Sequence, residues 1–352
     1  MLEILPFLKE LLSAPGISGY ESAVRPLIEK AWQPLTDKLE VSRLGSLHGL
    51  QKGTAPEPRP SILVAAHMDS VGLMVSGIID GFLRVTSIGG IDARVLPGQI
   101  VTVHGRRDLP GLIIAPPTRL LPASVQGGVV PLEYLLVDVG LLPDEVSNWV
   151  RVGDPISFAQ PPVEASGETL VGHTLDNRAS VAALTHCLEV LRTRQHLWDV
   201  WAVATVQEEV TLGGALTSAF QLHPSLAVAI DVTFGSEPYS PAHLTYPLGK
   251  GPTLIWGPVI HPFLFNNVKE LAERLEIPFT VEPVPRFSGT DSDAMQAVAE
   301  GIPNMVIGVP LRYMHTPTEM VAVKDITRAG RLVAEFIVQL DEKFMDRLTW
   351  ED

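Results

Sequence analysis

Short apolar segments alternate along the chain with segments of helical periodicity. The apolar segments show no polar alternation, which is typical of strands buried on both faces of a parallel sheet. They cover residues 61–70, 200–206, 226–232 and 304–310. Helices are expected at 179–194, from about 214, and at 263–275, 293–300 and 325–343. This alternation predicts an α/β fold, with a mostly parallel sheet covered by helices on both faces.

The pattern changes between residues 71 and 162, where short strands of alternating polarity are separated by Gly, Pro and Asp turns. Such spacing predicts a small β-barrel or sandwich inserted into the α/β domain. We therefore expect a catalytic domain made of residues 1–70 and 163–352. The block at 71–162 adds apolar surface but no candidate catalytic residue, so we expect it to serve dimerisation or assembly.

Composition narrows the possible functions. The 352 residues contain 26 Lys and Arg against 40 Asp and Glu, a formal charge of −14 that disfavours binding to nucleic acid. No apolar run approaches the roughly 20 residues of a membrane span. The N-terminus is expected to be a helix rather than a signal peptide, which predicts a cytoplasmic protein. The lone Cys187 excludes an internal disulfide and a thiolate-rich zinc site, and its apolar helical surroundings make it a poor nucleophile.

Side chains that can bind metals follow the predicted strands. Each has an ordinary structural explanation when taken alone: His67 and Asp69 can pair with each other, and Asp176 can cap a helix. The two acids after the strand 200–206 are expected on an extended segment, where neighbouring side chains point in opposite directions and take different roles. Five ligand-type residues nevertheless fall at strand ends of one inferred sheet: His67, Asp176, Glu209, Asp231 and His315.

Strand ends are where ligands and catalytic groups collect in open α/β sheets. Two His and three carboxylates suit two divalent ions that share one carboxylate, with zinc expected and cobalt or manganese as alternatives. Glu208 then remains as a general base, and Asp69 can orient His67.

Motifs along nearly the whole chain resemble those of the tetrahedral (TET-type) dinuclear aminopeptidases, metallopeptidase family forty-two, which includes glutamyl and leucyl aminopeptidases. The matching segments are LLSAPGISGYES, AAHMDSVGLMV, DARVLPGQIVTVHG, VRVGDPISF, GHTLDNRAS, VQEEVTLGGA, AIDVT, GTDSDA and GVPLRYMHTPTE. Asn177 and Ser180 depart from the residues more common in the family, as does Thr118 in the inserted block.

The resemblance implies a role for each candidate. His67 and Asp231 would hold one metal ion, Glu209 and His315 the other, and Asp176 would bridge them. Glu208 would be the general base. The implied activity is removal of N-terminal amino acids from peptides, by a hollow dodecamer built from dimers.

Two other functions remain as alternatives. One is a deacylase or dipeptidase with the same two-metal chemistry, although related deacylases place their extra domain between the last two ligands rather than between His67 and Asp176. The other is a catalytically silent assembly protein. The preferred N-terminal residue stays open, with Arg94, Arg119, Arg286 and Lys250 as possible partners for an acidic substrate side chain.

Overall fold

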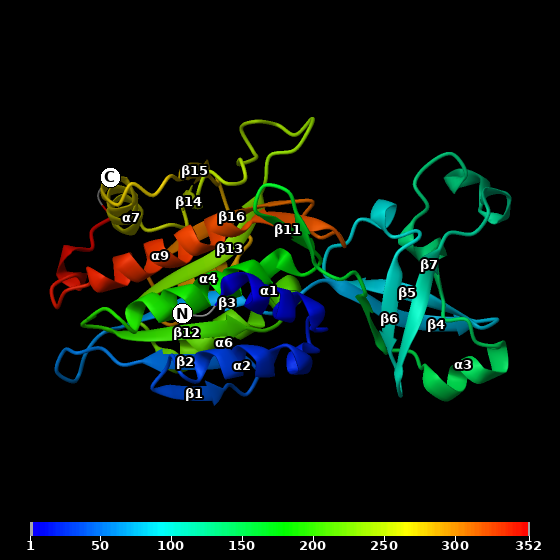
Figure 1. The fold of residues 1–352 in the computed structure, drawn as a ribbon, viewed down its shortest axis with the longest axis horizontal. Helices are drawn as coiled ribbons and strands as arrows, with labels where there is room; N and C mark the ends of the chain where they lie inside the picture. The colour runs from blue at the N-terminus through cyan, green and yellow to red at the C-terminus, as the bar shows by residue number, and fades with distance from the viewer. Residues whose placement is uncertain (1–2, 351–352) are drawn as a thin grey trace.

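The computed structural model describes residues 3–350. It consists of a large α/β body and a smaller barrel that projects from one side (Figure 1). The main sheet of the body runs in the order β1-β2-β12-β3-β13-β16-β17-β11-β10, and β14 and β15 branch from β16. Its strands are β1 (Lys38–Val41), β2 (Leu47–Gln51), β3 (Ser61–His67), β10 (Val163–Ala165), β11 (Thr169–Gly172), β12 (Asp199–Thr205), β13 (Leu226–Phe234), β14 (Thr253–Trp256), β15 (Thr280–Pro283), β16 (Asn304–Arg312) and β17 (Glu319–Ala322).

The four central strands β12, β3, β13 and β16 are parallel, as the apolar runs predict. Their residues are almost all buried, because helices cover both faces and leave no solvated side. The flanking strands β2 and β17 pair antiparallel with this centre. The predicted α/β class is confirmed, and the parallel arrangement belongs to the centre of the sheet.

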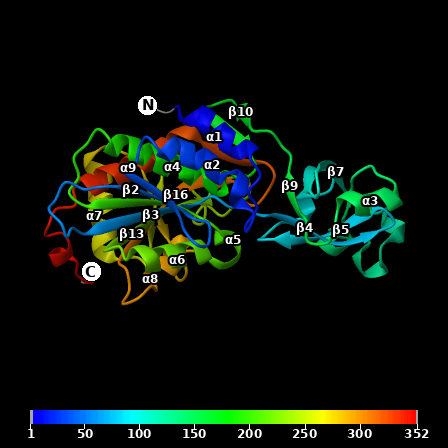
Figure 2. The ribbon, with the colours of Figure 1, turned by 90° about the horizontal axis from the view of Figure 1, so that it is seen from below.

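Two groups of helices cover the sheet (Figure 2). On one face α4 packs on β3 and β13, and α1 and α9 pack on α4; on the other face α6 packs on β12 and α8 packs on β13. The helices are α1 (Ile4–Ser13), α2 (Arg25–Trp32), α4 (Leu175–Leu191), α6 (Gly213–Leu222), α7 (Pro262–Arg274), α8 (Asp291–Gln296) and α9 (Val323–Val338). Within the described residues, no helix is long and apolar enough to cross a membrane.

Close packing of α4 and α9 depends on a glycine. A Cβ atom added to Gly330 would lie 2.2 Å from the backbone oxygen of Ala183, well inside van der Waals contact. The buried residues of α9 include Ile326, Ala329, Val333 and Phe336, which follow the three-to-four spacing of an amphipathic helix. The α9 helix therefore presents one apolar stripe to the core, and Gly330 sets its distance from α4.

The barrel lies between β3 and β10 in the chain and is closed in the order β4-β5-β8-β7-β6-β9. Its strands are β4 (Gly72–Ile79), β5 (Phe82–Ile88), β6 (Ile100–His104), β7 (Asp108–Ile114), β8 (Leu136–Asp138) and β9 (Pro155–Phe158), and the block also carries the α-helix α3 (Pro143–Trp149) and short 3-10 turns. Alternate apolar residues fill a core of its own. The β-rich insertion is thus a barrel, while its limits at 71 and 162 and its role in assembly stay predictions.

Some helix limits differ from those predicted. The helix expected at 293–300 is α8, which begins earlier because the Thr290 hydroxyl accepts a hydrogen bond from the Ser292 N–H and caps the helix. The final helix α9 ends at Val338 rather than near Lys343. A one-turn helix that the sequence did not predict, α5 (Glu208–Thr211), follows β12 directly.

Candidate active site

The seven predicted site residues come together where the central strands end. His67 ends β3, Asp231 lies on β13, and the two glutamates lie on α5 after β12. Asp176 stands at the start of α4, and His315 follows β16. Segments separated by up to about 250 residues of sequence therefore supply one cluster, because parallel strands bring their carboxyl ends to the same edge.

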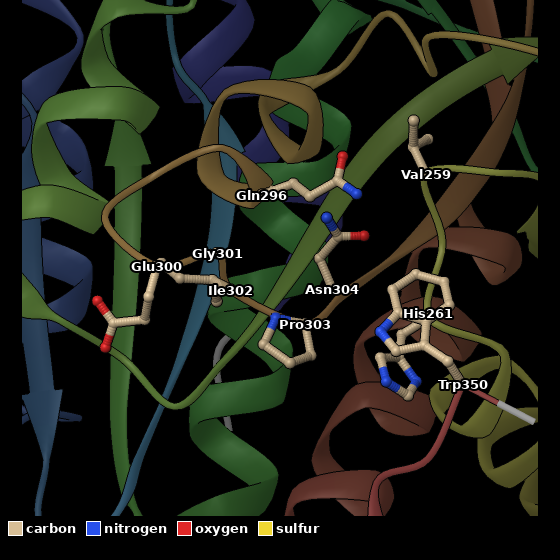
Figure 3. A pocket seen from close by; sticks show the side chains of 9 residues that line it. All are labelled: Val259, His261, Gln296, Glu300, Gly301, Ile302, Pro303, Asn304 and Trp350. Carbon is tan, nitrogen blue, oxygen red and sulfur yellow. The ribbon is translucent and has the colours of Figure 1, made fainter.

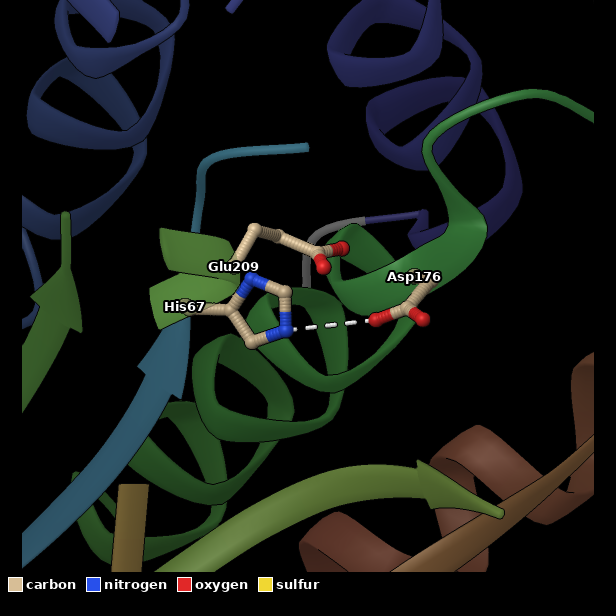
Figure 4. A group of neighbouring side chains, drawn as sticks. All are labelled: His67, Asp176 and Glu209. Carbon is tan, nitrogen blue, oxygen red and sulfur yellow. Dashed lines mark ion pairs between the residues drawn. The ribbon is translucent and has the colours of Figure 1, made fainter. Parts of the chain in front are cut away.

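The Asp176 carboxylate lies between the two histidines. Its Oδ1 is 3.2 Å from Nε2 of His67, and its Oδ2 is 3.3 Å from Nε2 of His315. Figure 4 shows the contact with His67. The alternative explanation of Asp176 as a helix cap is not supported, because among the described residues no backbone N–H group of α4 donates a hydrogen bond to its carboxylate. Each carboxylate oxygen of Asp176 instead faces a different imidazole.

The remaining acids complete two groups of potential ligands. His67, Asp176 and Glu209 place ligand atoms within 4.8 Å of one another, and so do His67, Glu208 and Asp231. The Nε2 atom of His315 is 3.4 Å from Oε2 of Glu209. These groups overlap at His67, so the structure brings together enough ligands for adjacent metal sites.

Asp69 fixes the turn that carries the glutamates. Its Oδ1 accepts a hydrogen bond from the Glu208 N–H at 3.0 Å, and its Oδ2 accepts one from the Glu209 N–H at 3.2 Å. The prediction of an extended segment at Glu208 and Glu209 is therefore wrong, since they start a helical turn. Nδ1 of His67 lies 3.1 Å from the backbone oxygen of Asp69 and 3.6 Å from its carboxylate. The Asp69 carboxylate thus serves mainly the two backbone amides.

The electrostatics of the cluster are those of a cation site. Burial, reinforced by neighbouring acids, raises the pKa of Glu208 to about 10 and that of Glu209 to about 8. Burial also opposes ionisation of Asp176, but hydrogen bonds from His315 and His67 hold its pKa below the ordinary value. Oε1 of Glu209 is buried and has no hydrogen-bond partner among the described residues. An unpartnered carboxylate oxygen among His and Asp donors fits a divalent metal ion.

Sequence reasoning missed two buried acids beside this cluster. Glu319 accepts hydrogen bonds from the backbone N–H groups of Asp176, at 3.1 Å, and His315, at 3.0 Å, so it ties both segments together. Asp291 accepts a hydrogen bond from the Thr205 hydroxyl at 2.5 Å, and burial raises its pKa to about 6. Glu319 lies in the motif GVPLRYMHTPTE and Asp291 in the motif GTDSDA, both noted above. Their place in these motifs is the sequence feature that could have identified them as site residues.

A cavity of about 280 Å³ opens onto the cluster. It is lined by His67, Asp176, Glu208, Glu209, Asp231, Val232, Thr233, Phe234, Ile255, Glu282, Ser288, Gly289, Thr290, Met314 and His315. None of the four basic residues considered as partners of an acidic substrate lines it. Cys187 is fully buried elsewhere, and burial raises the pKa of its thiol, which agrees with its expected inertness.

A second cavity, of about 240 Å³, lies beside the first residue of β16, at the end of the sheet away from the cluster (Figure 3). Its lining includes His261, Asn304 and Trp350 but no residue of the cluster. It offers no group of acids and histidines comparable to the first cavity. We therefore place the candidate chemistry in the first cavity.

The fold and this site define a metallopeptidase-like α/β protein, and comparison with known proteins identifies the family. Residues 45–332 match the family described as M42 glutamyl aminopeptidase. The lysyl aminopeptidase of Pyrococcus furiosus is 35% identical over 341 residues, which cover 95% of this chain and 96% of that protein. The chain belongs to the M42 peptidase family.

Solved structures agree with this assignment. A TET aminopeptidase from the marine sediment archaeon Thaumarchaeota archaeon SCGC AB-539-E09 superposes with a TM-score of 0.93 at 30% identity, covering 99% of this chain and 100% of that one. The TET1 peptidase of Pyrococcus horikoshii gives a TM-score of 0.83 at 29% identity, covering 96% and 100%. The predicted class, a metal-dependent aminopeptidase that hydrolyses peptide bonds, is confirmed.

Proposed function

We propose that this chain removes N-terminal amino acids from peptides with two divalent metal ions held in the cluster. The observation that carries the proposal is the position of Asp176, whose two carboxylate oxygens lie 3.2 Å and 3.3 Å from two different imidazoles. A carboxylate that faces one imidazole with each oxygen is suited to bridge two ions.

The proposed ligands divide by geometry and donor type. His67 and Asp231 would hold one ion, Glu209 and His315 the other, and Asp176 both. Imidazole nitrogen and carboxylate oxygen donors favour zinc, with cobalt and manganese as alternatives. Bound ions would lower the pKa of a water molecule and polarise the scissile carbonyl.

The protein side chains perform the proton transfers. Glu208 lines the cavity, and we assign its carboxylate the role of general base, which takes a proton from the attacking water and delivers it to the nitrogen of the leaving amine. Asp69 positions Glu208 by accepting its backbone N–H. Glu319 holds the backbone of Asp176 and His315 in the same way, so the cluster is preorganised by buried acids.

Assembly into a dodecamer built from dimers, with the block at 71–162 as the assembly domain, also belongs to this proposal. The P. horikoshii relative is described as assembling into a tetrahedron or a large octahedral shell. The barrel exposes large apolar side chains that a partner would cover, including Ile100 and Leu142. Light scattering should give about twelve times the chain mass of 38.1 kDa. A monomer at micromolar concentration would contradict the assembly.

Metal analysis combined with activity tests the central proposal. The purified protein should contain two ions per chain by plasma emission and should hydrolyse amino-acid anilides. Chelation should abolish activity, and zinc, cobalt or manganese should restore it. His315→Ala should leave about one ion, because His67, Asp176 and Asp231 still form the other site. Full activity after complete metal removal would refute the proposal.

A cytoplasmic location remains a further proposal, which cell fractionation can test.

A further inference from the structure

One acid in the active-site cavity has no role in the mechanism. Glu282 lines the same cavity as the metal-binding cluster but is absent from both groups of potential ligands. It lies on β15, opposite Ile255 of β14 in the strand pairing. Its position must therefore be explained by something other than metal binding.

Two threonines hold the Glu282 side chain in place. The Thr233 hydroxyl donates to its Oε1 at 2.8 Å, and the Thr253 hydroxyl donates to its Oε2, also at 2.8 Å. Both threonines are buried, with exposures of 3% and 0%. Each carboxylate oxygen is thus fixed by one donor, and in the part of the chain that the structure describes no Lys or Arg forms an ion pair with Glu282.

The β13 strand relates Glu282 to the metal cluster. Asp231 and Thr233 are two residues apart on this strand, so their side chains leave the same face of the sheet. Two residues of a strand span about 7 Å. Glu282, hydrogen-bonded to Thr233, therefore lies on the same side of β13 as the proposed metal ligand Asp231, and both residues line one cavity.

The charges around the cavity are one-sided. Within the described part of the chain, the cavity lining contains no Lys or Arg. The side chains of Ile255, Phe234 and Met314 supply apolar surface to the same cavity. A cationic side chain with an aliphatic stem would pack its carbons on this surface and pair its charge with Glu282. An acidic side chain would find no Lys or Arg in this lining and would be repelled by the Glu282 carboxylate.

We propose that Glu282 is a specificity-determining residue that selects substrates with a lysine or arginine at the N-terminus. The inference rests on the proposed aminopeptidase function and assigns the substrate class of that site. Glu282 binds the substrate side chain and takes no part in proton transfer. The sequence alone left this preference open, because nothing in the motif order indicated which charged residue faces the cavity.

The test compares lysine, leucine and glutamate anilides with the metal-loaded protein and its Glu282→Gln variant. Glutamine can keep both threonine contacts, since a hydroxyl can donate to its oxygen or accept from its nitrogen. Loss of a charge-assisted contact should lower kcat/KM for the lysine anilide by about 10- to 100-fold. The leucine anilide should change by less than threefold, and metal content should not change. Glu273→Gln, an exposed acid on α7, provides the matched control and should leave all three rates unchanged.

Each other outcome has a distinct meaning. An equal loss with lysine and leucine anilides would show that Glu282 binds the substrate α-amine, and would overturn the proposal. A wild-type preference for the glutamate anilide would also overturn it. If the wild-type protein cleaves none of the three, the aminopeptidase function itself fails, which is a separate result.

Discussion

Adjacent glutamates on the α5 turn provide a matched pair of variants, Glu208→Gln and Glu209→Gln. Both changes are isosteric, remove one charge and affect the same helical turn, so any general effect on the fold should be shared. The proposed roles differ. Glu208 would move a proton, while Glu209, whose Oε2 lies 3.4 Å from Nε2 of His315, would bind an ion.

The structure sets the expected magnitudes. Removing a general base slows turnover by about 10² to 10⁴, so Glu208→Gln should lose that factor in kcat while retaining two ions. Oε1 of Glu209 is buried and finds no hydrogen-bond partner within residues 3–350, so this oxygen is available to a metal. An amide binds a divalent ion more weakly than a carboxylate. Mutation of a residue that only supports a metal ligand lowers metal affinity by about 10- to 100-fold. Glu209→Gln changes a proposed ligand itself, so its metal affinity should fall by more than this factor, and the variant should retain about one ion after dialysis.

Plasma emission analysis and steady-state kinetics on the same samples decide the result, with Glu273→Gln as the exposed control. Glu208 could itself be a metal ligand, because it belongs to a potential ligand group with His67 and Asp231. Loss of an ion from Glu208→Gln with retention by Glu209→Gln would reverse the two roles. Retention of both ions by both variants would refute the assignment of Glu209 as a ligand.

Three further predictions concern stability and positioning. Chelated protein should lose stability as the pH rises from about 4.5 to about 10, because the pKa values of Glu208 and Glu209 are raised in the folded state, to about 10 and about 8, and the folded chain retains protons that the unfolded chain releases. Metal-loaded protein should not show this loss in melting-temperature measurements. Glu319→Gln should lower metal affinity by about 10- to 100-fold by titration, because one oxygen then replaces two in accepting the N–H groups of Asp176 and His315; unchanged affinity would exclude the positioning role. Gly330→Ala should reduce the free energy of unfolding by about 1 to 3 kcal/mol in denaturant melts, because its Cβ would meet the Ala183 backbone oxygen, and an unchanged midpoint would contradict the close packing of α4 and α9.

The sequence predicts the central strands because they are buried on both faces and therefore carry long apolar runs. Helix limits are predicted less well, since a single hydrogen bond such as that of the Thr290 hydroxyl moves the start of α8. The α5 turn at Glu208 was not predictable from polarity. It depends on the Asp69 carboxylate, which is 139 residues away in sequence and accepts the backbone N–H groups of both glutamates.

Candidate ligands were predictable because strand ends meet at one edge, but the supporting residues were not. Glu319 and Asp291 bind backbone or hydroxyl groups, and such contacts leave no periodic signal in a sequence. The same holds for Glu282, whose two threonine partners lie on β13 and β14. The candidate ligands could be predicted from the order of strands and helices. The residues proposed to orient them or to select substrates are placed by strand pairing and side-chain hydrogen bonds, which the sequence does not reveal. The proposed specificity residue Glu282 therefore depends on strand pairing, which the order of motifs in the sequence does not show.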